Sequence, residues 1–239
     1  MSTLNGGPNI VADGLVLYLD AGNTKSYISG STTWNDISRI GNNGTLTNGP
    51  TFNSADGGSI VFDGVDDFIT LGNISALGFT NGVFTAEAWV YVPSTWTAGS
   101  QYPNLISKGA SAGWDNAGWS LFVFRDWPSA GLYNWGCGIR NGGTALITQG
   151  SINMTPNIFT HICATADGSN VRLYQNGVLT FTYNQTVNPE LNSQSVLIGK
   201  DWTNNYFPGN VALTRLYNRA LSSSEVRQNF NATKGRFQL

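Results

Sequence analysis

The acidic and nucleophilic side chains of the sequence do not show the spacing that catalysis requires. Hydrolysis of a glycosidic bond needs two carboxyl groups that flank the bond. The sequence has three glutamates, Glu87, Glu190 and Glu225, and none of them sits in a paired carboxylate motif. His161 is the only histidine, so a Ser-His-Asp triad would have to be built around it. Its place in an apolar, strand-like run indicates a structural role, and we predict that the protein is not an enzyme.

A turn rich in aspartate is the candidate metal site. Asp63, Asp66 and Asp67 crowd a turn that contains glycine. Calcium takes several oxygen ligands from carboxylates and backbone carbonyls, which makes Asp66 and Asp67 its expected ligands. The simpler interpretation is turn chemistry, in which aspartate side chains accept hydrogen bonds from nearby backbone N–H groups. The sequence requires no other cofactor, since it has no phosphate-binding glycine motif and no zinc-ligand spacing.

Aromatic residues in turn-rich segments form the candidate carbohydrate site. The sequence has eight tryptophans, and a tryptophan left in water usually covers a core edge, meets a partner or binds a ligand. Sugar rings stack on aromatic faces, while amide and carboxylate groups bond the sugar hydroxyls. The predicted carbohydrate-binding residues are Trp114, Trp127, Trp202, Tyr206, Asn116 and Asn204. Loop packing and a protein interface remain the alternatives for these tryptophans.

The end of the chain is its one basic stretch. Only 11% of the residues are charged and the net charge is −2, so the sequence makes no case for nucleic acid as a partner. Residues 219–239 nevertheless carry four basic side chains and one acidic side chain. A solvated helix face is the simpler interpretation. The alternative is a surface that docks on an acidic partner through Arg227, Lys234 and Arg236.

Short strands separated by tight turns must position these residues. Asn-Gly occurs six times and Asp-Gly four times, and these pairs tolerate the positive φ that tight hairpins demand. Between them lie β-branched and aromatic runs typical of strands. The predicted strands are residues 14–20, 58–63, 68–71, 83–92, 104–107, 119–125, 132–140, 159–166, 170–174, 178–183, 195–199 and 210–217.

Alternation is clearest in residues 83–92, where every second residue from Phe84 to Val92 is apolar. This pattern predicts one face that meets an opposing sheet. The other face, which carries Thr85, Glu87 and Trp89, is expected to be half exposed or to line a groove. Many short strands with regular turns and no helical alternation predict a sandwich or a barrel.

One helix is expected, over about residues 222–232, followed by a basic tail at 233–239. Ser222 and Glu225 have the spacing of a capping box, in which each side chain satisfies a free N–H group at the helix start. Cys137 and Cys163 are the only cysteines and lie in strand-like runs, so we expect buried thiols. We predict a single all-β domain over residues 1–239, a two-sheet antiparallel sandwich with one short C-terminal helix.

Several motifs together resemble the laminin-G-like, or concanavalin A-like, lectin domain family. They are spread over nearly the whole chain in the family's order: GLVLYLD at 14–20, FDGVDDFI at 62–69, FTAEAWV at 84–90, HICAT at 161–165, LYQNG at 173–177, FPGNV at 207–211 and YNRALS at 217–222. The resemblance implies a jelly-roll sandwich. It does not choose a function, because this fold hosts lectins, adhesion modules, enzymes and structural proteins.

The closing segment, residues 229–237, also resembles the end of laminin-G-like proteins from tailed phages, including phages of aquatic bacteria such as cyanophages. This resemblance implies a virion surface protein, assembled in the host cytoplasm, as a capsid decoration, a head fibre or a tail fibre. Its expected partners are other virion proteins, further copies of itself and cell-surface polysaccharide. The start of the chain, with no basic or apolar stretch, predicts no signal peptide, and no run is long enough for membrane insertion. The alternatives are a soluble carbohydrate-binding lectin or adhesin module and, more remotely, a glycoside hydrolase.

Overall fold

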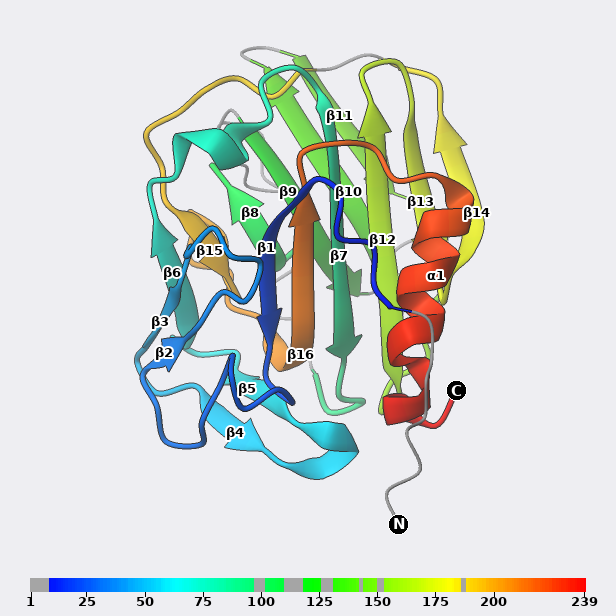
Figure 1. The fold of residues 1–239 in the computed structure, drawn as a ribbon. Helices are drawn as coiled ribbons and strands as arrows, with labels where there is room; N and C mark the ends of the chain where they lie inside the picture. Colours follow the sequence, from blue (N-terminus) through cyan, green and yellow to red (C-terminus); the bar gives the residue numbers. More distant parts are fainter. Residues whose placement is uncertain are drawn as a thin grey trace.

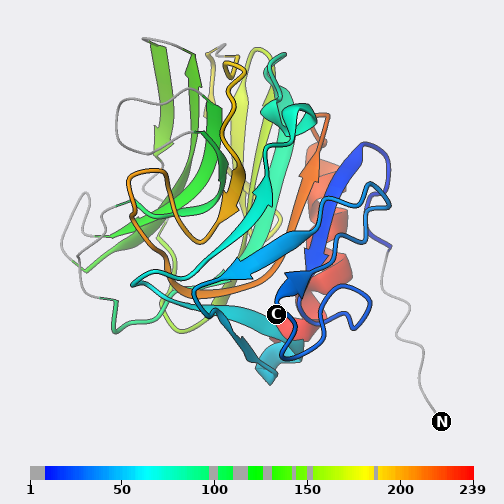
Figure 2. The same cartoon turned by 90° about the vertical axis from the view of Figure 1, so that its left-hand side faces the viewer.

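The structure is a computed structural model that describes residues 9–96, 102–109, 118–125, 131–141, 144–149, 153–185 and 188–239. Two eight-stranded antiparallel sheets form a sandwich, and one helix lies on the outside of the first sheet (Figures 1 and 2). This is the predicted all-β sandwich with one short C-terminal helix. Within the described ranges, no helix has the length and apolar character needed to cross a membrane.

The first sheet has the order β14-β13-β12-β7-β16-β5-β4, and β1 also pairs with β16. Its strands are β1 (Leu15–Asp20), β4 (Thr51–Asn53), β5 (Ser59–Asp63), β7 (Val83–Tyr91), β12 (Phe159–Asp167), β13 (Val171–Gln175), β14 (Val178–Tyr183) and β16 (Pro208–Tyr217). The second sheet has the order β11-β10-β9-β8-β15-β6-β3-β2. Its strands are β2 (Thr33–Trp34), β3 (Gly44–Thr47), β6 (Phe68–Gly72), β8 (Asn104–Lys108), β9 (Gly118–Arg125), β10 (Tyr133–Asn141), β11 (Thr144–Gln149) and β15 (Val196–Ile198).

Every predicted strand is present, with ends shifted by no more than about two residues. The strands that the sequence did not predict are β2, β3, β4 and β11. The first three have two to four residues each and are mostly polar, so they are too short to show an alternating pattern. Three short 3₁₀ helices, η1 (Ala55–Gly57), η2 (Ser75–Gly78) and η3 (Lys234–Phe237), complete the described elements.

The strand β7 shows where the sequence prediction was wrong. Phe84, Ala86 and Val90 face the sandwich interior and are fully buried, as expected. Glu87 and Trp89, on the opposite face, are also fully buried rather than half exposed. Helix α1 (Ser223–Thr233) and the C-terminal η3 cover this outer face (Figure 1). The helix and η3 that cover this face are more than 100 residues away from β7 in the sequence, so the alternating pattern within the strand does not reveal them.

Helix α1 begins where the sequence predicted. The Ser222 side chain accepts a hydrogen bond from the Glu225 backbone, and the Glu225 side chain accepts one from the Ser222 backbone, which confirms the capping box. Arg219 adds an ion pair, with 2.6 Å between its Nη2 and Glu225 Oε1. Hydrogen bonds from Arg219 lower the pKa of Glu225 from 4.5 to about 2; partial burial opposes this shift and the bonds from Ser222 reinforce it.

The helix cap is expected to lose its contribution to stability in acid. A carboxyl group whose pKa is lower in the folded than in the unfolded state stabilises the fold above the unfolded pKa and loses this contribution as the pH falls through the folded pKa. Between about pH 4.5 and pH 2, the melting temperature of Glu225→Gln should therefore fall less steeply than that of the parent. Asp56→Asn, which alters an exposed carboxylate in η1, is the matched control. Equal slopes for the parent and Glu225→Gln over this range would contradict the prediction.

Both cysteines are buried thiols, as predicted. Cys137 lies in the sandwich core, whereas Cys163 lies in a separate cluster with Tyr174, Tyr217 and Val226 beneath α1. Burial raises the pKa of the Cys137 thiol to about 12. Burial likewise raises the pKa of the Cys163 thiol, and a thiol with a raised pKa is a poor nucleophile at neutral pH.

Candidate functional site

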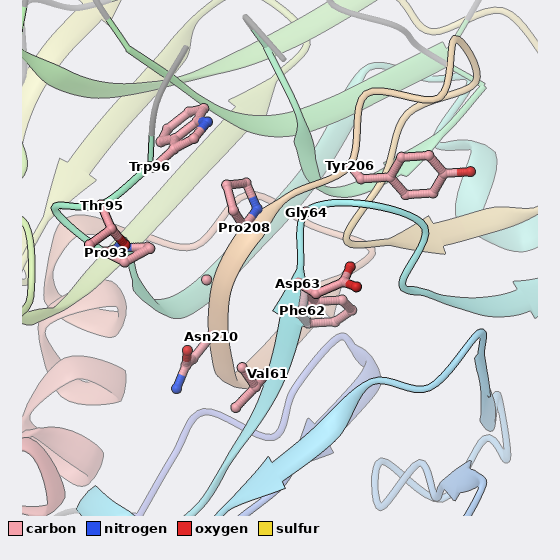
Figure 3. Close-up of a pocket in the computed structure, with 11 residues that line it drawn as sticks. Val61, Phe62, Asp63, Gly64, Pro93, Thr95, Trp96, Tyr206, Pro208 and Asn210 are labelled. Carbon is pink, nitrogen blue, oxygen red and sulfur yellow. The ribbon is translucent and has the colours of Figure 1, made fainter. Parts of the chain in front are cut away.

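A pocket of about 450 Å³ opens at one end of the first sheet, where β5 ends, β16 begins and the loop after β7 passes by (Figure 3). The antiparallel register pairs Pro208 with Asp63 and Asn210 with Val61, which places side chains from the two strands beside one another. The lining residues are Val61, Phe62, Asp63, Gly64, Pro93, Thr95, Trp96, Tyr206, Pro208, Gly209 and Asn210.

The pocket combines ring surfaces with polar groups. Figure 3 shows Pro93, Thr95 and Trp96 on one side of the start of β16, and Tyr206 and Asp63 on the other. Trp96 is buried and its ring centre lies 6.1 Å from that of Tyr133. It therefore forms a wall that packs against the core rather than an exposed platform.

The floor of the pocket leaves no room for a side chain at Gly209. This residue has φ of 157°, and a Cβ atom there would lie 2.4 Å from the Tyr91 carbonyl oxygen. The neighbouring Asn210 is half-buried and donates a hydrogen bond of 3.1 Å from Nδ2 to Ser59 Oγ. This bond fixes the amide plane, and the amide oxygen remains as an acceptor for a ligand.

A rigid loop between β15 and β16 presents Trp202, Asn204 and Tyr206. The Asp201 carboxylate, which is fully buried, accepts hydrogen bonds from Thr203 N at 2.8 Å, Asn205 N at 2.9 Å and Asn205 Nδ2 at 2.7 Å. An aspartate that bonds backbone N–H groups two and four residues ahead holds a turn in one conformation. The loop is therefore held in one conformation.

Lys200 orients Tyr206 within this loop. Its ammonium lies 4.5 Å from the ring centre of Phe68 and 5.1 Å from that of Tyr206, and it donates a hydrogen bond of 3.1 Å to Asn204 Oδ1. Cation–π contacts and this bond hold the half-buried Tyr206 side chain in place. Lys200 was not predicted from the sequence as a site residue.

The structure brings three of the predicted carbohydrate-binding residues into one loop and adds others from elsewhere. The Tyr206 hydroxyl donates a hydrogen bond of 3.4 Å to Asn204 Oδ1. Tyr206 lines the pocket, whereas Trp202 and Asn204 do not. Trp114, Asn116 and Trp127 lie outside the described residues. The sequence placed Asp63 only in the aspartate turn, and it did not single out Thr95, Lys200 or Asn210. Asn210 precedes the buried Val211, so alternation along β16 indicated that it faces outward, but only the strand register shows what it faces.

The aspartate turn joins β5 to β6 beside the pocket. One carboxylate oxygen from each of Asp63, Asp66 and Asp67 lies within 4.8 Å of the others, a separation that fits oxygen ligands around one calcium ion. Turn chemistry is also present, because Asp63 Oδ1 accepts bonds from Val65 N and Asp66 N, and Asp67 Oδ2 accepts one from Asp63 N. Burial raises the pKa of Asp67. The calcium site at Asp66 and Asp67 stays a prediction.

Glu87 and His161 form a buried network rather than a reactive centre. Glu87 Oε1 lies 2.8 Å from Arg215 Nε and accepts a hydrogen bond of 3.0 Å from Asn229 Nδ2, and Glu87 Oε2 lies 3.3 Å from His161 Nε2. All four side chains are fully buried. Burial raises the pKa of Glu87, but the nearby Arg215 guanidinium and the contacts of His161 and Asn229 outweigh it and lower the pKa overall. His161 is inaccessible to a substrate and has the structural role that the sequence predicted.

The basic residues near the C-terminus are used in different ways. Arg236 Nη1 lies 2.6 Å from Asp20 Oδ1, and Arg236 Nη2 donates a hydrogen bond of 2.6 Å to the Gly58 carbonyl oxygen. This side chain therefore holds η3 against the end of β1 and the start of β5. Lys234 Nζ lies 5.6 Å from the ring centre of Phe230. Arg227 is exposed on α1. Docking on an acidic partner stays a prediction, and Arg227 is the residue of the three most available for it.

Comparisons with known proteins agree with this architecture. Residues 63–227 match a family model, Laminin_G_3, described as the concanavalin A-like lectin/glucanases superfamily. The binding domain of paraclostridial mosquitocidal protein 1 has a similar structure, with a TM-score of 0.71 and 19% identity over 92% of this chain and 52% of that one. Domain 4 of AbnA, a GH43 extracellular arabinanase from Geobacillus stearothermophilus solved in complex with arabinotriose, gives a TM-score of 0.67 and 17% identity over 91% of this chain and 98% of that one.

The binding domain of botulinum neurotoxin serotype D also has this fold, with a TM-score of 0.67 and 14% identity over 92% of this chain. The chain spans about half the length of the two toxin binding domains, at 52% of each. No curated protein sequence matches the chain significantly.

Proposed function

The chain belongs to the concanavalin A-like lectin/glucanases superfamily, and from this we propose that it is a non-catalytic carbohydrate-binding module. Its ligand site is the pocket between β5, β16 and the loop after β7. The observation that carries the proposal is that an aromatic residue, an acidic residue and an amide residue, Tyr206, Asp63 and Asn210, line one pocket. The fold neighbours support it, since one of them was solved with arabinotriose and two are toxin binding domains.

The acidic residues around the pocket favour binding over hydrolysis. Among the described residues that line it, Asp63 is the only one with a carboxylate, and one of its oxygens already accepts two backbone hydrogen bonds. A glycosidase needs a second carboxyl group across the scissile bond. The remote alternative of a glycoside hydrolase therefore lacks its second acid here.

Replacing Tyr206 with alanine is expected to weaken binding of a neutral oligosaccharide about tenfold, a loss of about 1.4 kcal/mol. The substitution removes the ring on which a sugar would stack, while the exposed hydroxyl contributes little. Tyr206→Phe is the matched control and should bind within about twofold of the parent. Affinities are measured by isothermal titration with ligands chosen from a glycan array. A Tyr206→Ala variant, or a Trp202→Ala variant, that binds every glycan as the parent does would remove its residue from the site.

The same proposal includes a calcium ion, with Asp66 and Asp67 as its ligands. The two carboxylates lie beside Asp63, so an ion there would fix the turn that lines the pocket. The array is therefore run with added calcium and again with a chelator. Unchanged binding in the chelator, together with an unchanged melting temperature, would remove calcium from the proposal.

A second candidate function is a structural role in a tailed-phage particle, with the lectin-like site facing the host surface. This candidate rests on the resemblance of residues 229–237 to the end of laminin-G-like proteins from tailed phages. One feature of the structure supports an assembly. The edge strand β14 exposes Val178, Leu179 and Phe181, with 61%, 45% and 41% of their surface accessible, and uncovered apolar edge strands are sites of association. Co-sedimentation of the native protein with phage particles tests this candidate. A protein that stays soluble and monomeric would exclude it.

A further inference from the structure

A second hollow lies on the outer face of the first sheet, between the end of β1 and the end of α1. We propose that it is a separate binding site for a neutral, hydroxyl-rich ligand of oligosaccharide type. The hollow has a volume of about 850 Å³, and a smaller one of about 370 Å³ adjoins it and shares Ile10 and Tyr18 as lining residues. The pair offers room for several sugar units in a row. No residue of this site lines the pocket at Tyr206.

Tyr18 is the ring platform of this site. It is half-buried and lines both hollows. The guanidinium carbon of the buried Arg215 lies 5.3 Å from its ring centre, and its hydroxyl donates a hydrogen bond of 3.2 Å to Asp20 Oδ2. Burial raises the pKa of Tyr18 to about 12, so the hydroxyl stays protonated. A ring that contacts Arg215 and is hydrogen-bonded to Asp20 through its hydroxyl presents a fixed surface to a ligand.

The charges of the two charged residues that line the larger hollow cancel, whereas the smaller hollow adds the exposed Arg39. Asp20 and Arg236 form an ion pair of 2.6 Å, and their side chains are 10% and 17% exposed. The remaining Asp20 oxygen accepts the Tyr18 hydroxyl, while Arg236 Nη2 and Nε donate to the Gly58 and Asp56 carbonyls. A charged ligand would find no free counter-charge in this pair, and burying it there would be costly. The larger hollow, which holds this pair, therefore favours a neutral ligand.

Amide groups converge on the hollow from two elements. Asn23 lies in the turn after β1, and Asn231 lies in the last turn of α1. Within the described part of the chain, no protein group bonds the Asn23 Nδ2 or the Asn231 side-chain amide. An amide both donates and accepts, as a sugar hydroxyl does. Two such amides beside a fixed ring form a suitable set for a polyhydroxylated ligand.

The experiment counts binding sites by isothermal titration. The probes are neutral trisaccharides, namely arabinotriose, maltotriose, cellotriose and mannotriose, with the anionic sialyllactose for comparison. Thr24→Trp fills the hollow from an exposed position outside the core. Ser169→Trp, on an exposed turn elsewhere, is the matched control, and Asn231→Ala removes one amide. Thermal unfolding of each variant verifies that it is folded.

We expect the parent to bind two equivalents of a neutral trisaccharide. Thr24→Trp should abolish binding at the site at Tyr18, and Tyr206→Ala should weaken binding at the pocket at Tyr206. Asn231→Ala should weaken the site at Tyr18 about fivefold, and Ser169→Trp should change neither site. Three results would overturn the proposal: binding of one equivalent that Thr24→Trp leaves intact, no binding of any neutral probe, or binding of sialyllactose alone at this site. The first of these leaves the pocket at Tyr206 standing, so the two proposals fail separately.

Discussion

Replacing Arg215 with methionine is expected to lower the free energy of unfolding by about 3–5 kcal/mol. Methionine has a similar volume but no charge, so the fully buried Glu87 carboxylate would lose the guanidinium 2.8 Å from its Oε1. An uncompensated charge in the interior is far more costly than an exposed one. The loss should appear in urea unfolding, followed by tryptophan fluorescence.

Two comparisons test this explanation. Arg172→Met breaks a pair with Asp167 whose side chains are about one third exposed, at 32% and 30%, and should cost less than about 1 kcal/mol. Adding Glu87→Gln to Arg215→Met removes the stranded charge and should recover much of the loss. A decrease below about 1 kcal/mol for Arg215→Met alone would show that the network does not stabilise the fold.

Replacing Phe237 with alanine is expected to destabilise the fold by about 3 kcal/mol, although this residue lies near the end of the chain. Only 7% of its surface is exposed. Its ring stacks on Trp89 with 4.1 Å between ring centres, and lies 4.8 Å from Phe159. Removing the ring uncovers the Trp89 indole, so the change should appear both in chemical unfolding and in the fluorescence of the folded state.

Leu239→Ala is the matched control for this prediction. Leu239 lies two residues further along and is 47% exposed, so its truncation should change stability by less than about 0.5 kcal/mol. Equal small effects for both variants would mean that η3 does not hold the outer face of the sheet. The expected contrast would instead show that the basic tail is part of the domain's own packing.

Local features of this chain were predictable from its sequence, whereas contacts between distant residues were not. Alternation along β7 and the capping box at Ser222 are local, and both were predictable. The burial of Glu87 depends on Asn229, 142 positions away, and no pattern within the strand contains that contact. This is why the outer face was expected to be half exposed.

The candidate site shows the same division. Trp202, Asn204 and Tyr206 are close in sequence, so they were predictable as a group. Asp63 and Asn210 come together only through the pairing of β5 with β16. Strand pairing of this kind depends on the whole topology, so the composition of the pocket had to come from the structure.

The hydrogen bond between Val11 N and Asn229 Oδ1 joins positions 218 residues apart. Contacts of such large separation form late, because nearly all of the chain must already be ordered before they repay the entropy of closing the loop. The pairing of Leu15 with Tyr217 spans a similar separation, so we expect α1 to dock late, together with the pairing of β1 and β16, and Glu87 and Arg215 to be still hydrated in the transition state for folding. Interactions that are absent from that transition state act on the rate of unfolding. The network beneath α1 would then set how long a folded molecule lasts, and in Arg215→Met stopped-flow kinetics should show faster unfolding with little change in the folding rate.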